Sequence, residues 1–465
     1  MEIIVRRDVL QSKKSAIVDD EGNKITYKEL ADKAEKLSEY IEERSLIFIL
    51  CDHHLETVKF LYEVLYINRI PLLLSSDMDI ELLENLISIY KPQYIYCKKT
   101  YEVGMYYDHE IVMDNHVLLK TNSQKYKIHP DVALLLSTSG TTGGSKLVKL
   151  SYDNLYNNSE YACRHLNIKS GQKGVSPLPI NYTYGFAFCL WHWHCGATLL
   201  VTEEPVIGKK FQEFYIKEKA NNFAAIPYTY QMLQKVRFWD SKKIENLHFA
   251  MSGGAQLSEN DQINLISIMK DKFWVGYGQT ECTCIISAMN FEEGDLKLGT
   301  IGRAFDNMEV MVDSETKEML IKSRSVCMGY ASHRGQLADG DVNQGILHTG
   351  DTVYVDETGC IYLKGRLKRY VKILGKRVSL DDIENYLNNK YPNTEFACIG
   401  RDSDISVFYT VSASDLSEEI KILLEKCMKI PSKFVSCLRR DKLPRNNAGK
   451  IAYSKLEEIK SETER

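Results

Sequence analysis

A stretch rich in glycine and hydroxyl side chains, directly after an apolar run, constrains this chain more than any other feature. The apolar run covers residues 132–136 and predicts a buried β-strand. The stretch that follows reads Ser-Thr-Ser-Gly-Thr-Thr-Gly-Gly-Ser-Lys and ends at Lys146. Glycines let a backbone approach closely and direct its N–H groups at phosphate oxygens, while hydroxyls add donors and lysine adds charge. The pattern predicts a loop that holds a polyphosphate.

Two other interpretations bear on that prediction. A short Gly/Ser/Thr cluster standing alone is more often a polar turn between two strands. The Walker phosphate loop requires Gly-Lys followed by Ser or Thr, whereas this chain has Ser145-Lys146-Leu147. An ordinary P-loop NTPase is therefore not expected, and the case for a nucleotide depends on the rest of the chain.

Together with four further blocks, this stretch resembles the signature of the adenylate-forming (AMP-binding) superfamily. That family includes acyl-CoA synthetases, acyl-carrier-protein ligases, adenylation domains of peptide synthetases and luciferases. Each block alone is moderately specific, but all four occur in the family's order and span most of the chain. The blocks are residues 276–281 (Gly-Tyr-Gly-Gln-Thr-Glu), 348–351 (His-Thr-Gly-Asp), 365–372 (Gly-Arg-Leu-Lys-Arg-Tyr-Val-Lys) and 444–450 (Pro-Arg-Asn-Asn-Ala-Gly-Lys).

The resemblance implies an α/β fold: a large N-terminal domain of layered sheets and helices, and a smaller, mobile α+β C-terminal domain. The length of 465 residues exceeds one typical domain and agrees with this. A basic string at residues 366–376 follows Gly365, so we expect domains at 1–365 and 366–465. The second part has 20 Lys and Arg against 15 Asp and Glu, which suits either ordinary surface variation or contact with CoA phosphates or an acidic carrier protein.

Local patterns agree with alternating helices and strands. Residues 27–43 predict an amphipathic helix and residues 46–50 a buried strand. After the glycine-rich stretch, residues 147–150 predict a partner strand, and Ser151 is placed to cap the next helix. Short strands at 223–226 and 249–251, each followed by a helix, extend the rhythm of layered sheets covered by helices.

By resemblance, the chain binds ATP with Mg²⁺. Glu281 would ligate the Mg²⁺ that bridges the phosphates, and Thr142 would act beside it at the catalytic centre. Tyr277 would lie against adenine, Asp351 would accept hydrogen bonds from the ribose hydroxyls, and Arg366 would contact ribose or phosphate. The full set of expected nucleotide-binding residues is Thr138, Ser139, Gly140, Thr141, Thr142, Lys146, Gly253, Gly254, Tyr277, Gly278, Gln279, Thr280, Asp351 and Arg366.

The same resemblance assigns the C-terminal residues. Lys450 matches the catalytic lysine on the mobile domain, which reaches the carboxylate and nucleotide as charge develops. Lys368 occupies the hinge position about which that domain rotates between adenylation and thioester formation. Lys372 and Gly375 match the segment that faces the site in the thiol-transfer state, although Gly375 would also suit a simple turn.

The acyl pocket is expected to use Tyr182, Tyr184 and Gly185. Amino-acid-activating relatives usually place an Asp near here, because a buried ammonium without a partner is costly, and this chain has only Asn, Tyr and Thr at residues 181–184. We therefore expect an uncharged fatty, aryl or hydroxy acid, activated as an acyl-adenylate and passed to CoA or to the phosphopantetheine of an acyl or peptidyl carrier protein. The alternatives are an amino-acid:carrier-protein ligase, a catalytically silent nucleotide-binding homologue and a luciferase-like oxygenase.

Composition limits the other classes. No stretch approaches the roughly 20 apolar residues of a membrane span, and the net charge is −4, so we expect neither a membrane span nor a nucleic-acid partner. Twelve cysteines without a Cys-x-x-Cys spacing and a charged N-terminus predict a reducing cytoplasm. His192 and His194 could chelate a metal only from a strand, where they would share a face, so packing is the favoured interpretation.

Overall fold

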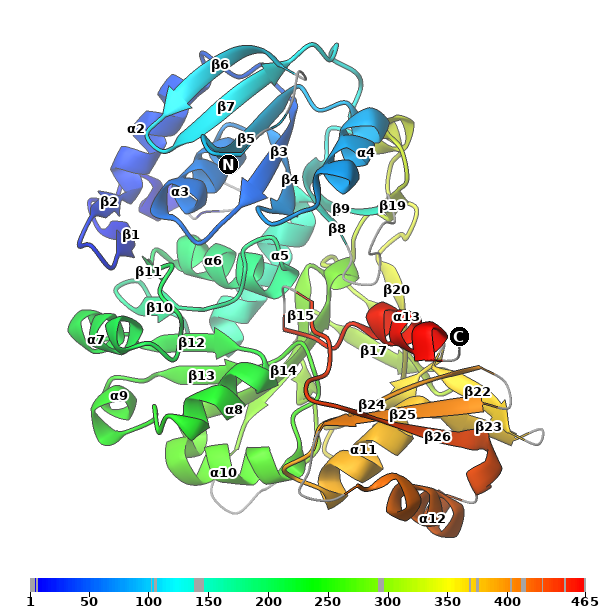
Figure 1. Ribbon diagram of the computed structural model, residues 1–465. Coiled ribbons are helices and arrows are strands. Elements are labelled where there is room, and N and C mark those ends of the chain that lie inside the picture. Colours follow the sequence, from blue (N-terminus) through cyan, green and yellow to red (C-terminus); the bar gives the residue numbers. More distant parts are fainter. Residues whose placement is uncertain are drawn as a thin grey trace.

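The fold is taken from a computed structural model, shown in Figure 1. The structure describes residues 5, 7–101, 103, 107–137, 146–291, 297–367, 369–373, 376–401, 404–410, 415–428, 430–446 and 449–463.

An eight-stranded sheet forms the upper body in Figure 1. Its order is β19-β9-β8-β4-β3-β5-β7-β6. The four adjacent strands β8, β4, β3 and β5 run parallel to one another. Parallel strands need crossover helices on the faces, which explains their almost continuous apolar sequences. The bounds are β3 (Leu46–Cys51), β4 (Ile70–Ser75), β5 (Tyr94–Lys98), β6 (Tyr107–Met113), β7 (His116–Thr121), β8 (Val132–Ser137), β9 (Leu147–Ser151) and β19 (Tyr330–Ala331).

A nine-stranded sheet forms the layer below, in the order β16-β15-β14-β13-β12-β10-β11-β1-β2. Its central strands are parallel, while β14 and β15 form a long antiparallel pair that carries the Gly-Tyr-Gly-Gln block. The bounds are β1 (Ser15–Asp19), β2 (Lys24–Thr26), β10 (Lys173–Val175), β11 (Thr198–Val201), β12 (Asn222–Ala225), β13 (Phe249–Ser252), β14 (Phe273–Gln279), β15 (Cys284–Asn290) and β16 (Arg303–Ala304).

Two helices, α5 (Tyr152–His165) and α6 (Thr183–Cys195), lie between the large sheets and pack on each other (Figure 1). The cap predicted for α5 is confirmed: Ser151 Oγ accepts a hydrogen bond from the backbone N–H of Asn154, and the side-chain oxygen of Asn154 accepts one from the backbone N–H of Ser151. Every residue of α6 is buried, which suits a helix enclosed on all sides. Each large apolar side chain buried there contributes roughly 1.5–3 kcal/mol to folding.

The remaining helices of the large body pack on the two sheets, and the one over Leu55–Tyr66 contacts a strand of each sheet. The helix expected over residues 27–43 is shorter: α2 ends at Leu37, since Ser38 to Tyr40 turn and the chain must reverse before β3. The helical segments are α1 (Arg7–Leu10), α2 (Tyr27–Leu37), α3 (Leu55–Tyr66), α4 (Ile80–Tyr90), α7 (Lys209–Glu218), α8 (Pro227–Lys235), α9 (Ser241–Glu245), α10 (Glu259–Met269), and the 3₁₀ turns η1 (Lys270–Lys272), η2 (Thr280–Cys282) and η3 (Arg334–Ala338).

The C-terminal part begins beyond a four-stranded antiparallel sheet of β17 (Glu309–Val312), β18 (Glu318–Lys322), β20 (Ile346–Val355) and β21 (Ile361–Arg366). A three-stranded sheet with helices packed on it follows, at the lower right of Figure 1. The boundary at residue 365 stays a prediction, and it falls within the end of β21. The elements are β22 (Tyr370–Ile373), β23 (Lys376–Ser379), α11 (Leu380–Lys390), β24 (Phe396–Arg401), β25 (Asp404–Thr410), α12 (Ser417–Met428), η4 (Ser432–Phe434), β26 (Val435–Arg440) and α13 (Tyr453–Thr463).

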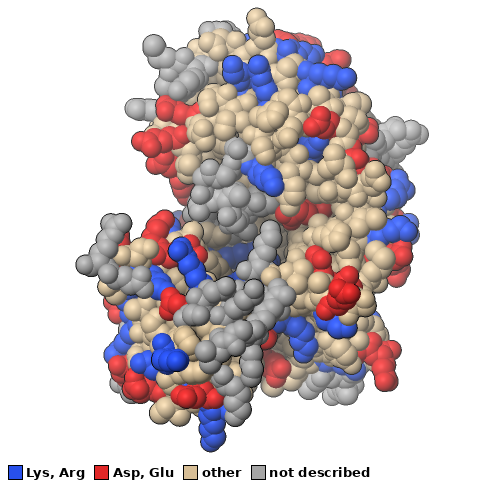
Figure 2. Space-filling view, turned by 90° about the vertical axis from the view of Figure 1, so that its right-hand side faces the viewer, with Lys and Arg blue, Asp and Glu red and all other residues tan. Residues whose placement is uncertain are grey.

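The predicted α/β fold class is thus confirmed, with layered sheets in the larger part and a small α+β part at the C-terminus. Among the described helices, none combines the length and apolar character that a membrane span requires. On the face shown in Figure 2, basic and acidic side chains are interspersed over the coloured residues instead of forming one patch of a single sign.

Candidate active site

Three of the sequence blocks meet at the carboxylate of Asp351. This side chain is almost fully buried on β20 and accepts hydrogen bonds from Tyr277 Oη at 2.5 Å and Gln279 Nε2 at 2.7 Å. Arg366, at the end of β21, donates from Nε to its other oxygen at 2.9 Å. Burial and the neighbouring Asp351 charge raise the pKa of Tyr277 well above its usual range, so its hydroxyl stays a donor. Strand pairing of β20 with β21 places Asp351 opposite Arg366.

A second carboxylate, Glu281 on η2, lies beside a tyrosine that sequence reasoning missed. Tyr330 donates its hydroxyl to Glu281 Oε1 at 2.7 Å, and Lys146 Nζ stands 4.7 Å from the centre of the same ring. Burial and the Glu281 charge raise the pKa of the Tyr330 hydroxyl. Tyr330 reaches this place because β19 pairs antiparallel with β9, with Tyr330 opposite Val148.

The predicted phosphate-binding residues Thr138, Ser139, Gly140, Thr141 and Thr142 lie outside the described residues. The structure does describe what flanks them. Strands β8 and β9 are antiparallel, and Ser137 pairs with Leu147, so both ends of the glycine-rich stretch meet at one point of the sheet. Because Lys146 contacts Tyr330 there, this point lies next to Glu281.

Lys450 comes from the C-terminal part and enters the same region. Its Nζ lies 5.0 Å from the ring centre of Tyr182, and burial, followed by the charge of Arg366, lowers its pKa to about 8. Asp351 and Glu281 are both near enough to oppose that shift electrostatically. The ammonium therefore lies within electrostatic reach of both carboxylates described above.

The segment that carries Lys450 is held against the larger part by contacts no motif indicated. Arg445 stacks its guanidinium 4.1 Å from the ring centre of Tyr228 on α8, and it donates to the carbonyl of Gly449 at 2.7 Å. Gly449 has a positive φ of 72°, and a Cβ there would stand 2.4 Å from Ile226. Glycine is needed at this position because the turn passes so close to the larger part.

The glycines and threonine near the nucleotide-binding block have specific packing roles. A Cβ at Gly278 would stand 1.4 Å from the carbonyl oxygen of Cys284, so the close passage of β15 requires glycine there. Thr280 exchanges a hydrogen bond of 2.6 Å with Thr183 at the start of α6. The α6 helix is thereby tied directly to the block that carries Glu281.

The residues predicted for the acyl side gather at the start of α6. Tyr182 precedes the helix and faces Lys450, whereas Tyr184 donates its hydroxyl to the carbonyl of Met251 at 3.1 Å. A Cβ at Gly253 would stand 3.2 Å from the Tyr184 ring, and one at Gly254 would stand 2.6 Å from Tyr182 Oη. Gly185 packs on the carbonyl of Pro179, where a Cβ would stand 2.2 Å away, so its described role is helix packing.

Three residues were predicted to act in domain rotation and thioester formation, and the structure describes only one of them. Lys368 and Gly375 lie outside the described residues, and Lys372 lies on β22, where the backbone alone is described and pairs with Arg377 of β23. Their roles stay predictions.

The paired histidines are packing residues, as favoured from the sequence. They lie on a helix, so their side chains diverge. His192 contacts the carbonyl of Phe188 and the amide of Asn222, whereas His194 contacts Glu160. Burial lowers the pKa of His192 to about 4, which keeps it neutral.

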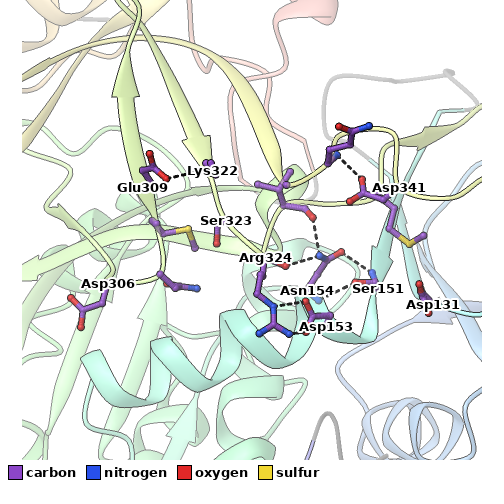
Figure 3. Close-up of a pocket in the computed structure, with 16 residues that line it drawn as sticks. Asp131, Ser151, Asp153, Asn154, Asp306, Glu309, Lys322, Ser323, Arg324 and Asp341 are labelled. Atoms are coloured by element: carbon purple, nitrogen blue, oxygen red, sulfur yellow. Dashed lines mark hydrogen bonds and ion pairs between the residues drawn. The ribbon is translucent and has the colours of Figure 1, made fainter.

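A separate hollow of about 680 Å³ is shown in Figure 3. Its described lining contains none of the predicted site residues, and it includes two ion pairs: Arg324 with Asp153, and Lys322 with Glu309 at 3.2 Å. Arg324 follows β18 and Asp153 lies in the first turn of α5, so their ion pair joins two layers of the fold, whereas Lys322 and Glu309 pair across neighbouring strands β18 and β17.

The two carboxylates fit the groups that the resemblance implies. A carboxylate offers about four acceptor positions; the donors on Asp351 use three, which leaves capacity for a hydroxyl. Tyr330 donates to one oxygen of Glu281, and no hydrogen bond from a described residue engages the other, which a cation could bind. Within the described residues, no cluster of three His, Cys, Asp or Glu side chains could hold a metal alone. A Mg²⁺ here would take most of its ligands from phosphate and water, as this ion usually does beside nucleotides.

Comparison with known proteins decides the family. The sequence signature of the AMP-binding enzyme family matches residues 6–331. The chain belongs to the AMP-binding enzyme family. This AMP-binding family member is 27% identical over 350 residues to the 4-coumarate–CoA ligase-like 2 of Arabidopsis thaliana, a match of 71% of this chain and 61% of that protein. It is 22% identical over 480 residues to the 2-succinylbenzoate–CoA ligase of Oceanobacillus iheyensis, covering 97% and 98% of the two chains.

The fold of this AMP-binding family member also matches solved structures. ATP-bound MatB from Rhodopseudomonas palustris superposes with a TM-score of 0.80 at 19% identity, over 96% of this chain and 95% of that one. At this identity the match concerns the fold. The resemblance stated from the five sequence blocks is thereby confirmed at the level of family and fold.

Proposed function

We propose that this chain activates a carboxylic acid with ATP and then passes the acyl group to a thiol. A carboxylate oxygen attacks the α-phosphorus, the bond to pyrophosphate breaks, and an acyl-adenylate forms. A pantetheine thiol then attacks the acyl carbonyl and AMP leaves. The observation that carries this proposal is the convergence of Asp351, Glu281 and Lys450 from three distant segments.

The nucleotide would be held at its ribose and base by the Asp351 cluster. The ribose hydroxyls would donate to Asp351, with Arg366 beside them and Tyr277 against the base. Gly253 and Gly254 would allow close approach. The further residues assigned to the nucleotide are Thr138, Ser139, Gly140, Thr141, Thr142, Lys146, Gly278, Gln279 and Thr280.

Glu281 would hold Mg²⁺ together with phosphate oxygens, and the ion would neutralise phosphate charge when bound. Tyr330 fixes the orientation of the Glu281 carboxylate, and Lys146 places a cation over the ring of Tyr330. These residues bring positive charge and an oriented ligand to the end of β8 and β9, where the glycine-rich stretch begins and ends.

Lys450 would bind the developing negative charge between the acid and the α-phosphate. Its location above Tyr182 supports this role, because the expected acyl side begins at that ring. Lys368 as a hinge, and Lys372 and Gly375 in a thiol-transfer arrangement, complete the proposal for the second half-reaction.

CoA is the favoured acceptor, since the relatives named above are CoA ligases. A carrier protein bearing phosphopantetheine is the alternative acceptor, and an amino acid the alternative substrate. The intact trio of Asp351, Glu281 and Lys450 favours an active ligase over a silent nucleotide-binding homologue. All twelve cysteines are free and ten of them are buried, which suits the cytoplasm that we propose as its compartment.

The test is acid-dependent ATP–pyrophosphate exchange with Mg²⁺ over fatty, aryl, hydroxy and amino acids. We expect exchange with one class of uncharged acid, and an at least hundredfold loss in Lys450→Ala with ATP binding largely retained. Lys455→Ala removes an exposed lysine from the same part of the chain and serves as the matched control. ATP binding without exchange for any acid would favour the silent homologue.

A further inference from the structure

The point where the acid must be activated is marked by Lys450 and Tyr182. The ammonium lies 5.0 Å from the Tyr182 ring centre, and its Cε would stand 3.7 Å from a Cβ on Gly254. The Tyr182 hydroxyl stands 2.6 Å from the same Cβ position. On the proposed role of Lys450, Gly254 lies beside the reacting carboxylate, and the rest of the acid extends away from it.

Gly253 and Gly276 lie near this point, and the side chains of Tyr184 and Met251 fill the space next to them. Gly253 directly precedes Gly254, and the Tyr184 ring stands 3.2 Å from the position of a Gly253 Cβ. Gly276 lies on the neighbouring strand β14, and Met251 Sδ on β13 stands 2.9 Å from the position of a Gly276 Cβ. A passage running past these glycines beneath the sheet would have to displace Tyr184 and Met251.

The two side chains that fill this space are fixed in place. Tyr184 hydrogen-bonds the backbone of Met251 at 3.1 Å and packs near Trp191, with ring centres 6.3 Å apart. Tyr184, Met251 and Trp191 belong to one continuous buried core. Because a close-packed interior leaves little room for rotamer changes, they form a wall and not a flap.

The wall stands close to the reacting point. The Tyr184 ring stands against Gly253, the residue directly before the Gly254 that faces Lys450. Its other neighbours are also uncharged: Ile226 contacts the Gly254 position at 3.4 Å, and Ile285 contacts the Gly276 position at 3.6 Å. Burial raises the pKa of the nearby Cys284 thiol, which keeps it neutral. A second charge on the acid would have no partner in this wall.

We propose that the substrate is a short, uncharged monocarboxylic acid, on the scale of acetate to butyrate, whose tail ends against Tyr184 and Met251. The inference rests on the proposed acid activation and narrows its substrate class. Medium-chain and long-chain fatty acids would need the space that these two side chains occupy.

The test compares unbranched acids from acetate to octanoate, and benzoate, in ATP–pyrophosphate exchange. We expect kcat/KM for butyrate to exceed that for octanoate at least a hundredfold. In Met251→Ala and, separately, in Tyr184→Ala, the ratio of kcat/KM for octanoate to kcat/KM for butyrate should rise at least tenfold. Phe214→Ala makes a comparable cavity in another core cluster, on α7, and should leave the ratio unchanged.

A binding measurement separates failure of this inference from failure of the proposed function. Unreactive acyl-sulfamoyl adenosines with butyryl or octanoyl groups are titrated by calorimetry, and the butyryl compound should bind at least tenfold more tightly. Octanoate used as well as butyrate, or an unchanged ratio in both wall variants, would overturn the short-acid wall while leaving acid activation intact. If no acid supports exchange and neither acyl group raises the affinity above that of sulfamoyl adenosine itself, both the short-acid wall and the proposed acid activation would be overturned.

Discussion

The alkaline limb of the pH–rate profile should report the protonation of Lys450. Burial and Arg366 lower its pKa from 10.5 to about 8 in the unliganded protein. Since one pKa unit corresponds to about 1.4 kcal/mol, the folded site favours the neutral amine by roughly 3 kcal/mol relative to a solvated lysine. Bound ATP brings negative charge and should raise the pKa again.

The assay is ATP–pyrophosphate exchange between pH 6.5 and 10, which avoids titration of the acceptor thiol. The value of kcat/KM for ATP, which reports the free enzyme, should fall about tenfold per unit above pH 8, and the limb for kcat should lie at least one unit higher. Lys450→Arg keeps its charge throughout this range, so its limb should shift upward even if its rate is lower. The control Lys455→Arg should keep the wild-type profile.

Two outcomes would refute the reasoning. A wild-type kcat/KM that stays level to pH 10 would mean that the pKa of Lys450 is not lowered, or that the reaction does not need the charged form of Lys450. An alkaline limb at the same pH in Lys450→Arg would assign the titration to another group.

Three further predictions concern other residues. Glu63 on α3 is buried and its pKa is raised to about 7, so the folded state holds the proton, and the stability that this protonation contributes is lost as pH rises through 7. Glu63→Gln should therefore raise the free energy of unfolding, measured by urea denaturation, by up to about 3 kcal/mol at pH 8.5 and by little at pH 4.5. Tyr330→Phe removes the bond that orients Glu281 and should raise the Mg²⁺ needed for half-maximal exchange about tenfold; an unchanged Mg²⁺ titration would remove Tyr330 from the site. Asp351→Asn should weaken AMP binding by about 2 kcal/mol, roughly thirtyfold by calorimetry, and equal affinity would contradict the ribose assignment.

Local patterns in the sequence were sufficient for several elements. The apolar run before the glycine-rich stretch is strand β8, and Ser151 caps α5, because burial on both faces and capping chemistry depend on a few neighbouring residues. The predicted length of α2 was wrong, because the amphipathic pattern of the sequence continues beyond Leu37 while the chain turns to enter β3. Tertiary context decides where a helix ends when its own pattern does not.

By itself, the sequence indicated the family through the order of its blocks, and it predicted Asp351, Glu281 and Lys450 as the groups that carry the chemistry. It could not indicate that Tyr330 orients Glu281, that Arg445 anchors the lysine segment, or that Tyr184 and Met251 fill the space in front of two glycines. Those contacts join residues that lie tens to hundreds of positions apart. Periodicity and motifs describe neighbours along the chain, whereas the limits of the acyl side depend on which distant side chains the sheets and α6 bring together.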